Sequence, residues 1–120
     1  MILLDYSSKT PIFEQIKEQI IFLVQKGVLS PHDKLPSIRA LASELGVNMN
    51  TVKRSFAELE ENGVVYSQAG RGLFIAQTAL NNEAVRTKAL AELENTAATA
   101  ASKGVKKEEA LAILDRVYAQ

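Results

Sequence analysis

Cysteine is absent from the 120-residue chain, which excludes disulfides and cysteine-ligated metal sites. Histidine occurs once, as His32, and has no second histidine to complete a metal site or a catalytic pair. We therefore expect His32 to be structural or solvated rather than a metal ligand. The chain also lacks a phosphate-binding glycine motif and clustered carboxylates outside helix ends. These absences predict a protein that is not an enzyme and that holds no metal or cofactor.

Long hydrophobic runs are missing as well, although apolar residues make up a normal 47% of the chain. The longest run, "IIFLV" from Ile20 to Val24, is far shorter than a membrane span. The beginning, "MILLDYSSK", carries Asp5 and no cationic stretch, so it does not have the form of a signal peptide. We expect a cytoplasmic protein without a membrane partner, and the lack of cysteine is compatible with a reducing compartment.

An excess of charge of either sign is also missing, because 14 basic side chains balance 14 acidic ones. Nucleic-acid-binding domains are usually basic, so this balance weighs slightly against that class. Within residues 34–75, however, the cations stand early in the expected helices or in loops, and the acids stand late. The cations are Lys34, Arg39, Lys53, Arg54 and Arg71, and the acids are Glu44, Glu58, Glu60 and Glu61.

Residues 11–26 have the pattern of a buried helix. Thr10 offers a hydroxyl N-cap, and Pro11 suits the first helical position. Apolar residues follow at helical spacing, and Gly27 offers a left-handed stop. Phe13 and Val24 widen the apolar stripe, and because Ile21 and Phe22 are apolar too, we expect this helix to be well buried.

Residues 37–63 predict two helices joined by a tight turn. Ser37 is expected to cap the first helix, which ends at Gly46, and Asn48 is expected to cap the second. So short a connection containing a glycine is typical of a helix-turn-helix. The second helix, over about 49–62, begins with amides, a hydroxyl and cations on the face opposite its apolar residues.

A β-hairpin is predicted directly behind the helix-turn-helix. Residues 64–67 and 73–76 are β-rich, and "AGRG" (69–72) between them supplies a turn with two glycines. This combination is a winged helix, in which the hairpin is the wing. The earlier stretch "LSPHDKLPS" (29–37) contains two prolines and predicts an irregular connection.

The chain changes character after Thr78. Two further helices are expected on either side of Gly104, the first rich in alanine, and both have too few large apolar residues to form a core alone. We therefore predict a mostly α fold with a small β-hairpin. It consists of a winged helix-turn-helix DNA-binding domain over residues 1–77 and a helical dimerisation tail of two helices over residues 78–120.

The segments "PIFEQIKEQI", "KLPSIRALASELGVNMNTVKRSFAELEENGVV" and "GRGLFI" resemble the GntR family of bacterial transcription regulators. The short tail resembles that of the YtrA-type subgroup, which uses two helices for dimerisation. The resemblance is tight over residues 3–76 and loose over the tail. This chain departs from the family in having His32 where a glycine is usual, Met49 where proline or arginine is frequent, and Leu73 where threonine is usual.

The resemblance implies a set of DNA-contacting residues, carried over position by position. They are Arg39, Asn48, Met49, Asn50, Thr51, Lys53, Ala69 and Gly70.

The chemistry of these side chains suits B-form DNA. The major groove admits one α-helix, whose N-terminal residues read the bases, and asparagine amides pair well with adenine. Lys53 can reach guanine or phosphate. Arg71 lies between two glycines of the wing turn, over 68–72, and suits a narrow minor groove. Further candidates for phosphate contact are Lys34, Ser37 and Arg54.

Plainer interpretations remain open for several of these residues. The plainer interpretation of Asn48 is a cap alone, that of Lys53 and Arg54 is a solvated face, and that of Arg71 is an ordinary turn charge. Met49 is expected to face the groove rather than the core.

The apolar side chains of the tail have no evident use within one chain, and they predict a homodimer. Two-fold symmetry would match an inverted-repeat operator. The tail is too small to enclose a large metabolite, so any small-molecule effector would bind at the dimer or interdomain interface. The resemblance implies a repressor, and the alternative is a winged-helix protein-interaction module without specific DNA binding. The expected interface residues are Leu90, Leu93, Leu111, Leu114, Val117 and Tyr118.

Overall fold

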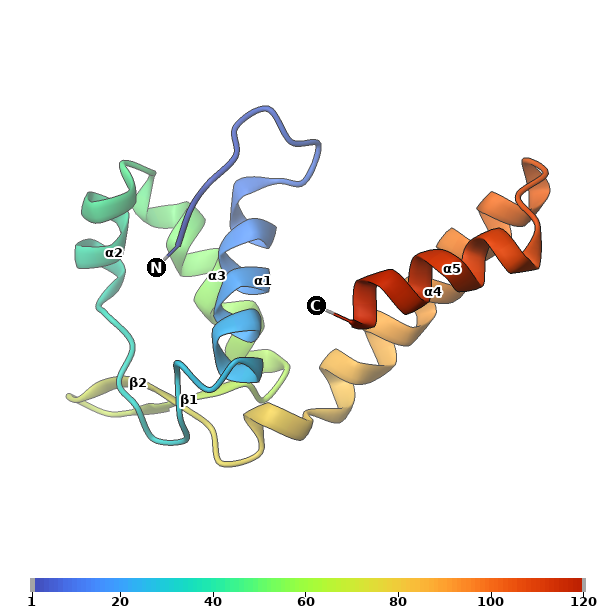
Figure 1. The fold of residues 1–120 in the computed structure, drawn as a ribbon. Coiled ribbons are helices and arrows are strands. Elements are labelled where there is room, and N and C mark those ends of the chain that lie inside the picture. Colours follow the sequence, from blue (N-terminus) through green and yellow to red (C-terminus); the bar gives the residue numbers. More distant parts are fainter. Residues whose placement is uncertain (1, 120) are drawn as a thin grey trace. The chain divides into compact units, whose positions relative to one another are not determined.

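The computed structural model describes residues 2–119 and consists mainly of helices with one antiparallel hairpin (Figure 1). The chain divides into two compact units, one ending at Ala84 and the other beginning at Val85. None of the helices within residues 2–119 combines the length and hydrophobicity of a bilayer-spanning helix. The elements are α1 (Ile12–Gln25), α2 (Ile38–Leu45), α3 (Met49–Glu61), β1 (Val65–Gln68), β2 (Gly72–Ile75), the short 3-10 helix η1 (Ala79–Asn81), α4 (Glu83–Ser102) and α5 (Lys107–Tyr118).

The predicted first helix is present, but its start and its burial differ from expectation. Pro11 itself is the N-cap residue, and no side chain caps the helix. The expectation that Thr10 caps it is therefore wrong. The carbonyl of Thr10 instead accepts a hydrogen bond from Gln15 Nε2 at 2.8 Å. Phe22, expected to be buried, is 55% exposed, because the buried stripe of α1 lies on another face.

The segment before α1 runs back along that helix and is held by two glutamines one turn apart. Gln15 pairs with Asp5 in both directions, since Nε2 donates to the Asp5 carbonyl and Oε1 accepts from the Asp5 amide, each at 2.9 Å. Gln19 pairs in the same way with the backbone of Leu3. The N-terminal segment is thus anchored through its backbone.

The core of the first unit lies where α1, α2 and α3 meet the wing. Figure 1 shows α1 and α3 side by side with α2 at one flank. Each helix contributes one apolar face, as its period predicts. The buried apolar residues are Ile16, Ile20, Val24, Leu35, Leu41, Ala42, Val52, Phe56, Leu59, Val64, Val65, Ile75 and Ala79.

The helix-turn-helix is present with the predicted caps. Ser37 Oγ accepts the Ala40 amide at 3.0 Å at the start of α2. Gly46 ends α2 with φ at +68°, a left-handed conformation that glycine adopts at little cost. Asn48 Oδ1 then accepts the Asn50 amide at 2.7 Å at the start of α3. Short-range chemistry therefore determines both helix starts and the turn between them.

The wing is the predicted hairpin, with its strands shifted by one residue. Gln68 pairs with Gly72, and three residues form the turn. The connection is irregular, as predicted, and an isolated bridge between Lys34 and Phe74 ties it to β2. The amide of His32 donates to the Ile75 carbonyl at 2.7 Å, and the amide of Leu35 donates to the Leu73 carbonyl at 2.8 Å. The wing is therefore supported by the segment that leads into α2.

The short helix η1 belongs to the first unit. Gln25 Nε2 donates to the Leu80 carbonyl at 2.8 Å, and Asn82 Nδ2 donates to the Asn62 carbonyl at 2.7 Å. The predicted domain boundary after residue 77 falls before this short helix, whereas the compact unit extends to Ala84.

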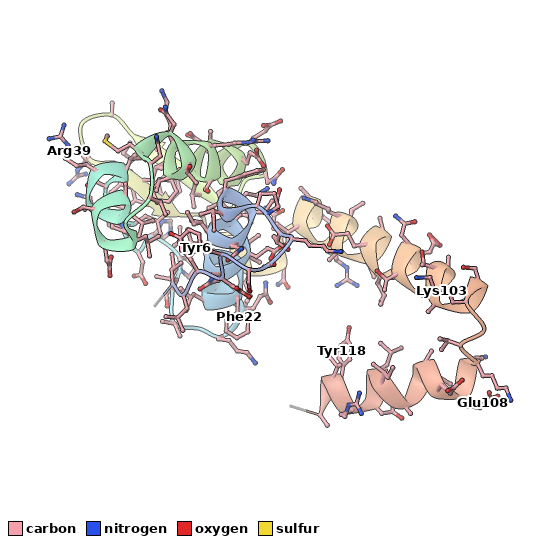
Figure 2. The ribbon with its side chains drawn as sticks, turned by 90° about the horizontal axis from the view of Figure 1, so that it is seen from above. Tyr6, Phe22, Arg39, Lys103, Glu108 and Tyr118 are labelled. Atoms are coloured by element: carbon pink, nitrogen blue, oxygen red, sulfur yellow. The ribbon has the colours of Figure 1, made fainter. Side chains whose placement is uncertain are left out.

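The second unit is a helical hairpin without an interior of its own. Neither α4 nor α5 has a buried residue. Figure 2 shows the two helices diverging from the turn near Lys103 as separate arms. Glu109 closes the start of α5, because its carboxylate accepts the Lys106 amide at 2.9 Å.

Candidate nucleic-acid interface

The N-terminal end of α3 presents a polar edge to solvent. Asn48, Asn50 and Lys53 are exposed and Thr51 is half-buried, whereas Val52 is completely buried on the opposite face. Helix periodicity causes this separation, because the buried residues of α3 recur every three or four positions. The edge therefore has no other element over it in the first unit.

Met49 lies on the same exposed end of α3, outside the core, with 47% of its surface accessible. The cap of Asn48 uses its Oδ1, and the side-chain amide nitrogen points away from that bond. The N-terminus of a helix carries partial positive charge, which favours an anion beside it. The first turn of α3 thus combines amide donors, a hydroxyl and an apolar side chain with a site that suits phosphate.

Three cations surround one open groove between the start of α2 and the wing. Its volume is about 970 Å³, and Lys34, Arg39 and Arg71 all line it. Arg39 projects from the first turn of α2 into solvent (Figure 2). Ser37 lines the same groove. Arg71 is far along the sequence from the other residues named here, and the chain fold brings it beside them.

The wing tip consists of small or exposed residues in a tight turn. Ala69, Gly70 and Arg71 are exposed. Gly70 has φ at +75°, which any residue with a Cβ would adopt only with strain. The Arg71 amide donates to the Gln68 carbonyl at 2.9 Å and closes the turn. A side chain at position 71 therefore extends from a rigid loop.

Arg54 is exposed, with 61% of its side chain accessible, but it has contacts with two side chains of the first unit. Its Nε donates to Glu58 Oε2 at 3.1 Å, and its guanidinium carbon lies 3.6 Å from the centre of the Phe13 ring. Glu58 also accepts from Lys17 Nζ at 2.8 Å. These two hydrogen bonds, first that from Lys17 and then that from Arg54, hold the pKa of Glu58 below its ordinary value. Lys17 was not expected from the sequence, because a lysine within α1 has no local signal for burial.

His32 joins the loop before α2 to the wing. Its φ is +70°, a left-handed conformation that a residue with a Cβ adopts only with strain. The two ring nitrogens lie 2.7 Å from the Tyr66 hydroxyl and 3.0 Å from Gln77 Oε1. No group of three or more acidic or histidine side chains within residues 2–119 is arranged to hold a metal.

The tail exposes the apolar side chains that the sequence singled out. Leu90, Leu93, Leu111 and Val117 are between 45% and 55% exposed, and Tyr118 is 78% exposed. Leu114 is half-buried. Two further apolar residues were missed, Val105 at 37% and Ile113 at 48%.

A sequence profile described as "Bacterial regulatory proteins, gntR family" matches residues 12–75, from α1 to the end of the wing. The chain belongs to the GntR family. The predicted fold and the predicted family are confirmed. GntR proteins are regulators and not enzymes, as the sequence led us to expect.

Two relatives come from Bacillus subtilis (strain 168). The HTH-type transcriptional repressor YtrA is 46% identical over 79 residues, which are 66% of this chain and 61% of the repressor. The uncharacterized HTH-type transcriptional regulator YhcF is 37% identical over 107 residues, which are 88% of each chain. The predicted resemblance to the YtrA-type subgroup is therefore confirmed by a YtrA protein among the relatives.

Solved structures of GntR-like proteins share the architecture. A transcriptional antiterminator from Listeria monocytogenes EGD-e superposes with a TM-score of 0.86 at 36% identity, covering 100% of this chain and 90% of that one. YtrA from Sulfolobus acidocaldarius, a GntR-family transcription factor, gives 0.61 at 44% identity, covering 75% and 97%. AraR(DBD) in complex with operator ORE1 gives 0.54 at 29% identity, covering 63% and 93%.

Proposed function

We propose that the protein is a sequence-specific DNA-binding transcription regulator that binds an inverted-repeat operator as a homodimer. The observation that carries this proposal is the common exposure of two features in one unit. One is the polar edge of α3, and the other is the groove lined by Lys34, Arg39 and Arg71. The neutral net charge weighs slightly against the proposal, but three cations line a single groove.

In this proposal α3 enters the major groove. Asn50, Thr51 and Lys53 contact base edges, with Met49 against a thymine methyl. Asn48 and the helix N-terminus bind a phosphate. We leave Arg54 out of the contact set, since its guanidinium already has Glu58 and Phe13 as partners.

The groove beside α2 accepts the phosphate backbone, and the wing reaches the neighbouring minor groove. Ser37, Lys34 and Arg39 face the backbone, and a guanidinium at position 71 suits the negative potential of a narrow minor groove. Ala69 and Gly70 allow the wing backbone to approach closely. The solved complex of AraR(DBD) with operator ORE1 supports DNA as the partner of this fold.

The tail forms the dimer. Two helices that leave their leucines exposed, and that diverge from their turn, do not bury these side chains against each other. A second copy can fill the opening between them, as in a four-helix bundle. Dimerisation places two copies of α3 on a palindromic site. An effector, if the protein has one, would bind at the dimer or interdomain interface.

Repression is the proposed outcome, supported by the name of the relative YtrA, a transcriptional repressor. A protein bound to operator DNA acts in the compartment that holds the chromosome, which in a bacterium is the cytoplasm. A winged-helix module that binds another protein is the alternative, and the neutral net charge of the chain favours it slightly.

Fluorescence anisotropy with duplex DNA at a series of salt concentrations tests the proposal. DNA fragments recovered from a random-sequence pool by selection on the protein serve as operator candidates. We expect an inverted repeat in the selected sequences and an affinity that falls steeply as salt rises. The salt slope is the slope of the logarithm of the affinity against the logarithm of the salt concentration. Lys53→Ala should reduce the magnitude of this slope by about 1 if the lysine binds a phosphate. Failure to enrich any sequence, with binding indifferent to salt, would favour the protein-interaction module.

A further inference from the structure

Lys17 is a charged residue in the interior of the first unit. It lies in the middle of α1 and is 4% exposed. Its Nζ lies 2.8 Å from Glu58 Oε1 on α3 and 3.6 Å from Glu14 Oε1 on its own helix. Removing an ammonium from water is costly, and a buried ion pair often stabilises a protein no better than apolar residues of similar size. Stability alone is therefore a weak explanation for a lysine at this position.

The ion pair is one end of a chain of directional contacts between α1 and α3. The second oxygen of Glu58 accepts from Arg54 at 3.1 Å, and the guanidinium of Arg54 stacks on Phe13 in the first turn of α1. Ser55, which is completely buried, donates from Oγ to the Phe13 carbonyl at 2.8 Å. These contacts join two turns of α3 to the N-terminal half of α1.

Directional contacts constrain the rotation of a helix about its axis, which apolar packing alone constrains less. Apolar contact is favourable in many orientations, whereas a charge-assisted hydrogen bond requires a given distance and direction. Recognition requires side chains held to within about 0.5 Å and 10–20° of the productive geometry. Lys53 is the residue before Arg54, and Asn50 is one turn earlier, so any rotation of α3 that breaks the network also turns these two side chains.

We propose that Lys17 is a positioning residue for DNA recognition: through Glu58, its buried ammonium fixes the rotation of α3 and thereby the direction of Asn50 and Lys53. This inference rests on the proposed DNA-binding function. Lys17 itself contacts no DNA, and Arg54 acts as the outer part of the same network. The role concerns discrimination between DNA sequences more than the strength of binding to DNA in general.

Lys17→Met is the first variant, because methionine fills a similar volume without charge. Glu58 stays partly exposed and keeps Arg54, so no buried charge is left alone and the urea midpoint should change little. The readout is the affinity for a selected inverted-repeat duplex divided by the affinity for a scrambled duplex at the same salt. We expect this ratio to fall about tenfold, the value of roughly one base contact. The salt slope should stay unchanged.

Glu58→Gln tests the same contact from its solvent-accessible side and remains informative if Lys17→Met does not fold. It should lower the ratio in the same direction. Glu14→Gln is the matched control, because Glu14 also lies near Lys17 but on the same helix, and it should leave the ratio at the wild-type value. A wild-type ratio in both Lys17→Met and Glu58→Gln would overturn the positioning role.

Lys53→Ala separates this inference from the proposed function. If the wild-type protein prefers the selected duplex and Lys53→Ala weakens its binding, while both network variants keep the wild-type ratio, the positioning role alone is wrong. If the wild-type protein has no preference for any duplex, the proposed function is wrong, and the positioning role, which rests on it, is wrong as well.

Discussion

Nδ1 of His32 lies 2.7 Å from the hydroxyl of Tyr66, and this contact joins the loop before α2 to the wing. The Tyr66 ring in turn stacks on Phe74, with 5.6 Å between the ring centroids. The same loop supplies Lys34 to the groove beside α2. His32 therefore links the wing to the loop that leads into α2.

His32→Ala should destabilise the protein by about 1 kcal/mol, because both side-chain hydrogen bonds are lost. Alanine also has a Cβ, so the left-handed backbone conformation at position 32 stays strained in this variant. His32→Gly loses the same bonds but removes that strain, so it should be the more stable of the two variants, by up to about 1 kcal/mol. Urea unfolding measures both. An alanine variant as stable as wild type would show that the contacts of His32 contribute nothing.

Asn48→Asp should separate helix capping from DNA binding. Aspartate caps as well as asparagine and its charge suits the positive end of a helix, so stability should be unchanged or slightly higher. The same charge would repel a phosphate, so affinity for a selected duplex should fall. Asn48→Ala serves as the control, with a loss of stability of about 1 kcal/mol. Unchanged DNA affinity in Asn48→Asp would mean that Asn48 is a cap alone.

Leu114→Glu should convert the proposed dimer to monomers, since it places a charge on the apolar flank of α5. Sedimentation or light scattering gives the molar mass, and affinity for a palindromic duplex should fall with it. Ala112→Glu is the matched control, because it adds the same charge on the opposite side of α5 and should leave the dimer intact. Dimers of Leu114→Glu, or monomers of the wild-type protein, would contradict the assignment of the tail.

Glu58 should make stability depend on pH in the acid range. The hydrogen bonds from Lys17 and Arg54 lower its pKa in the folded protein, so the unfolded chain binds the proton more readily. Its contribution is complete above the ordinary glutamate pKa of about 4.5 and is lost as the pH falls through the lower folded value.

Glu58→Gln should therefore lose less stability than wild type as the pH falls from about 5 to about 3, a window that begins about half a unit above the ordinary glutamate pKa and ends about 1.5 units below it. Urea unfolding at several pH values measures the difference. Asp5, whose pKa is lowered by hydrogen bonds from Ser7, is present in both proteins and cancels. Parallel pH profiles for the two proteins would contradict the prediction.

Several elements were predictable because their causes lie within a few residues. The caps at Ser37 and Asn48, the left-handed stop at Gly46 and the glycine turn of the wing each depend on neighbouring backbone groups. The exposure of the polar edge of α3 followed from helix periodicity alone. The same local logic failed at Thr10, because Pro11 is the N-cap residue and no side chain caps α1; the Thr10 carbonyl accepts from Gln15 Nε2 instead.

What the sequence alone determined is the set of helices and turns, the winged-helix order and the identity of the polar edge, because these depend on periodicity and local hydrogen bonds. Only the tertiary structure decided which distant groups meet. Lys17 and Glu58 are 41 residues apart, and His32 and Tyr66 are 34 residues apart. Neither pair has a local signal, because a contact between separate elements depends on how their buried faces pack. The burial of Lys17 and the contacts of Arg54 with Glu58 and Phe13 could therefore be found only in the folded structure.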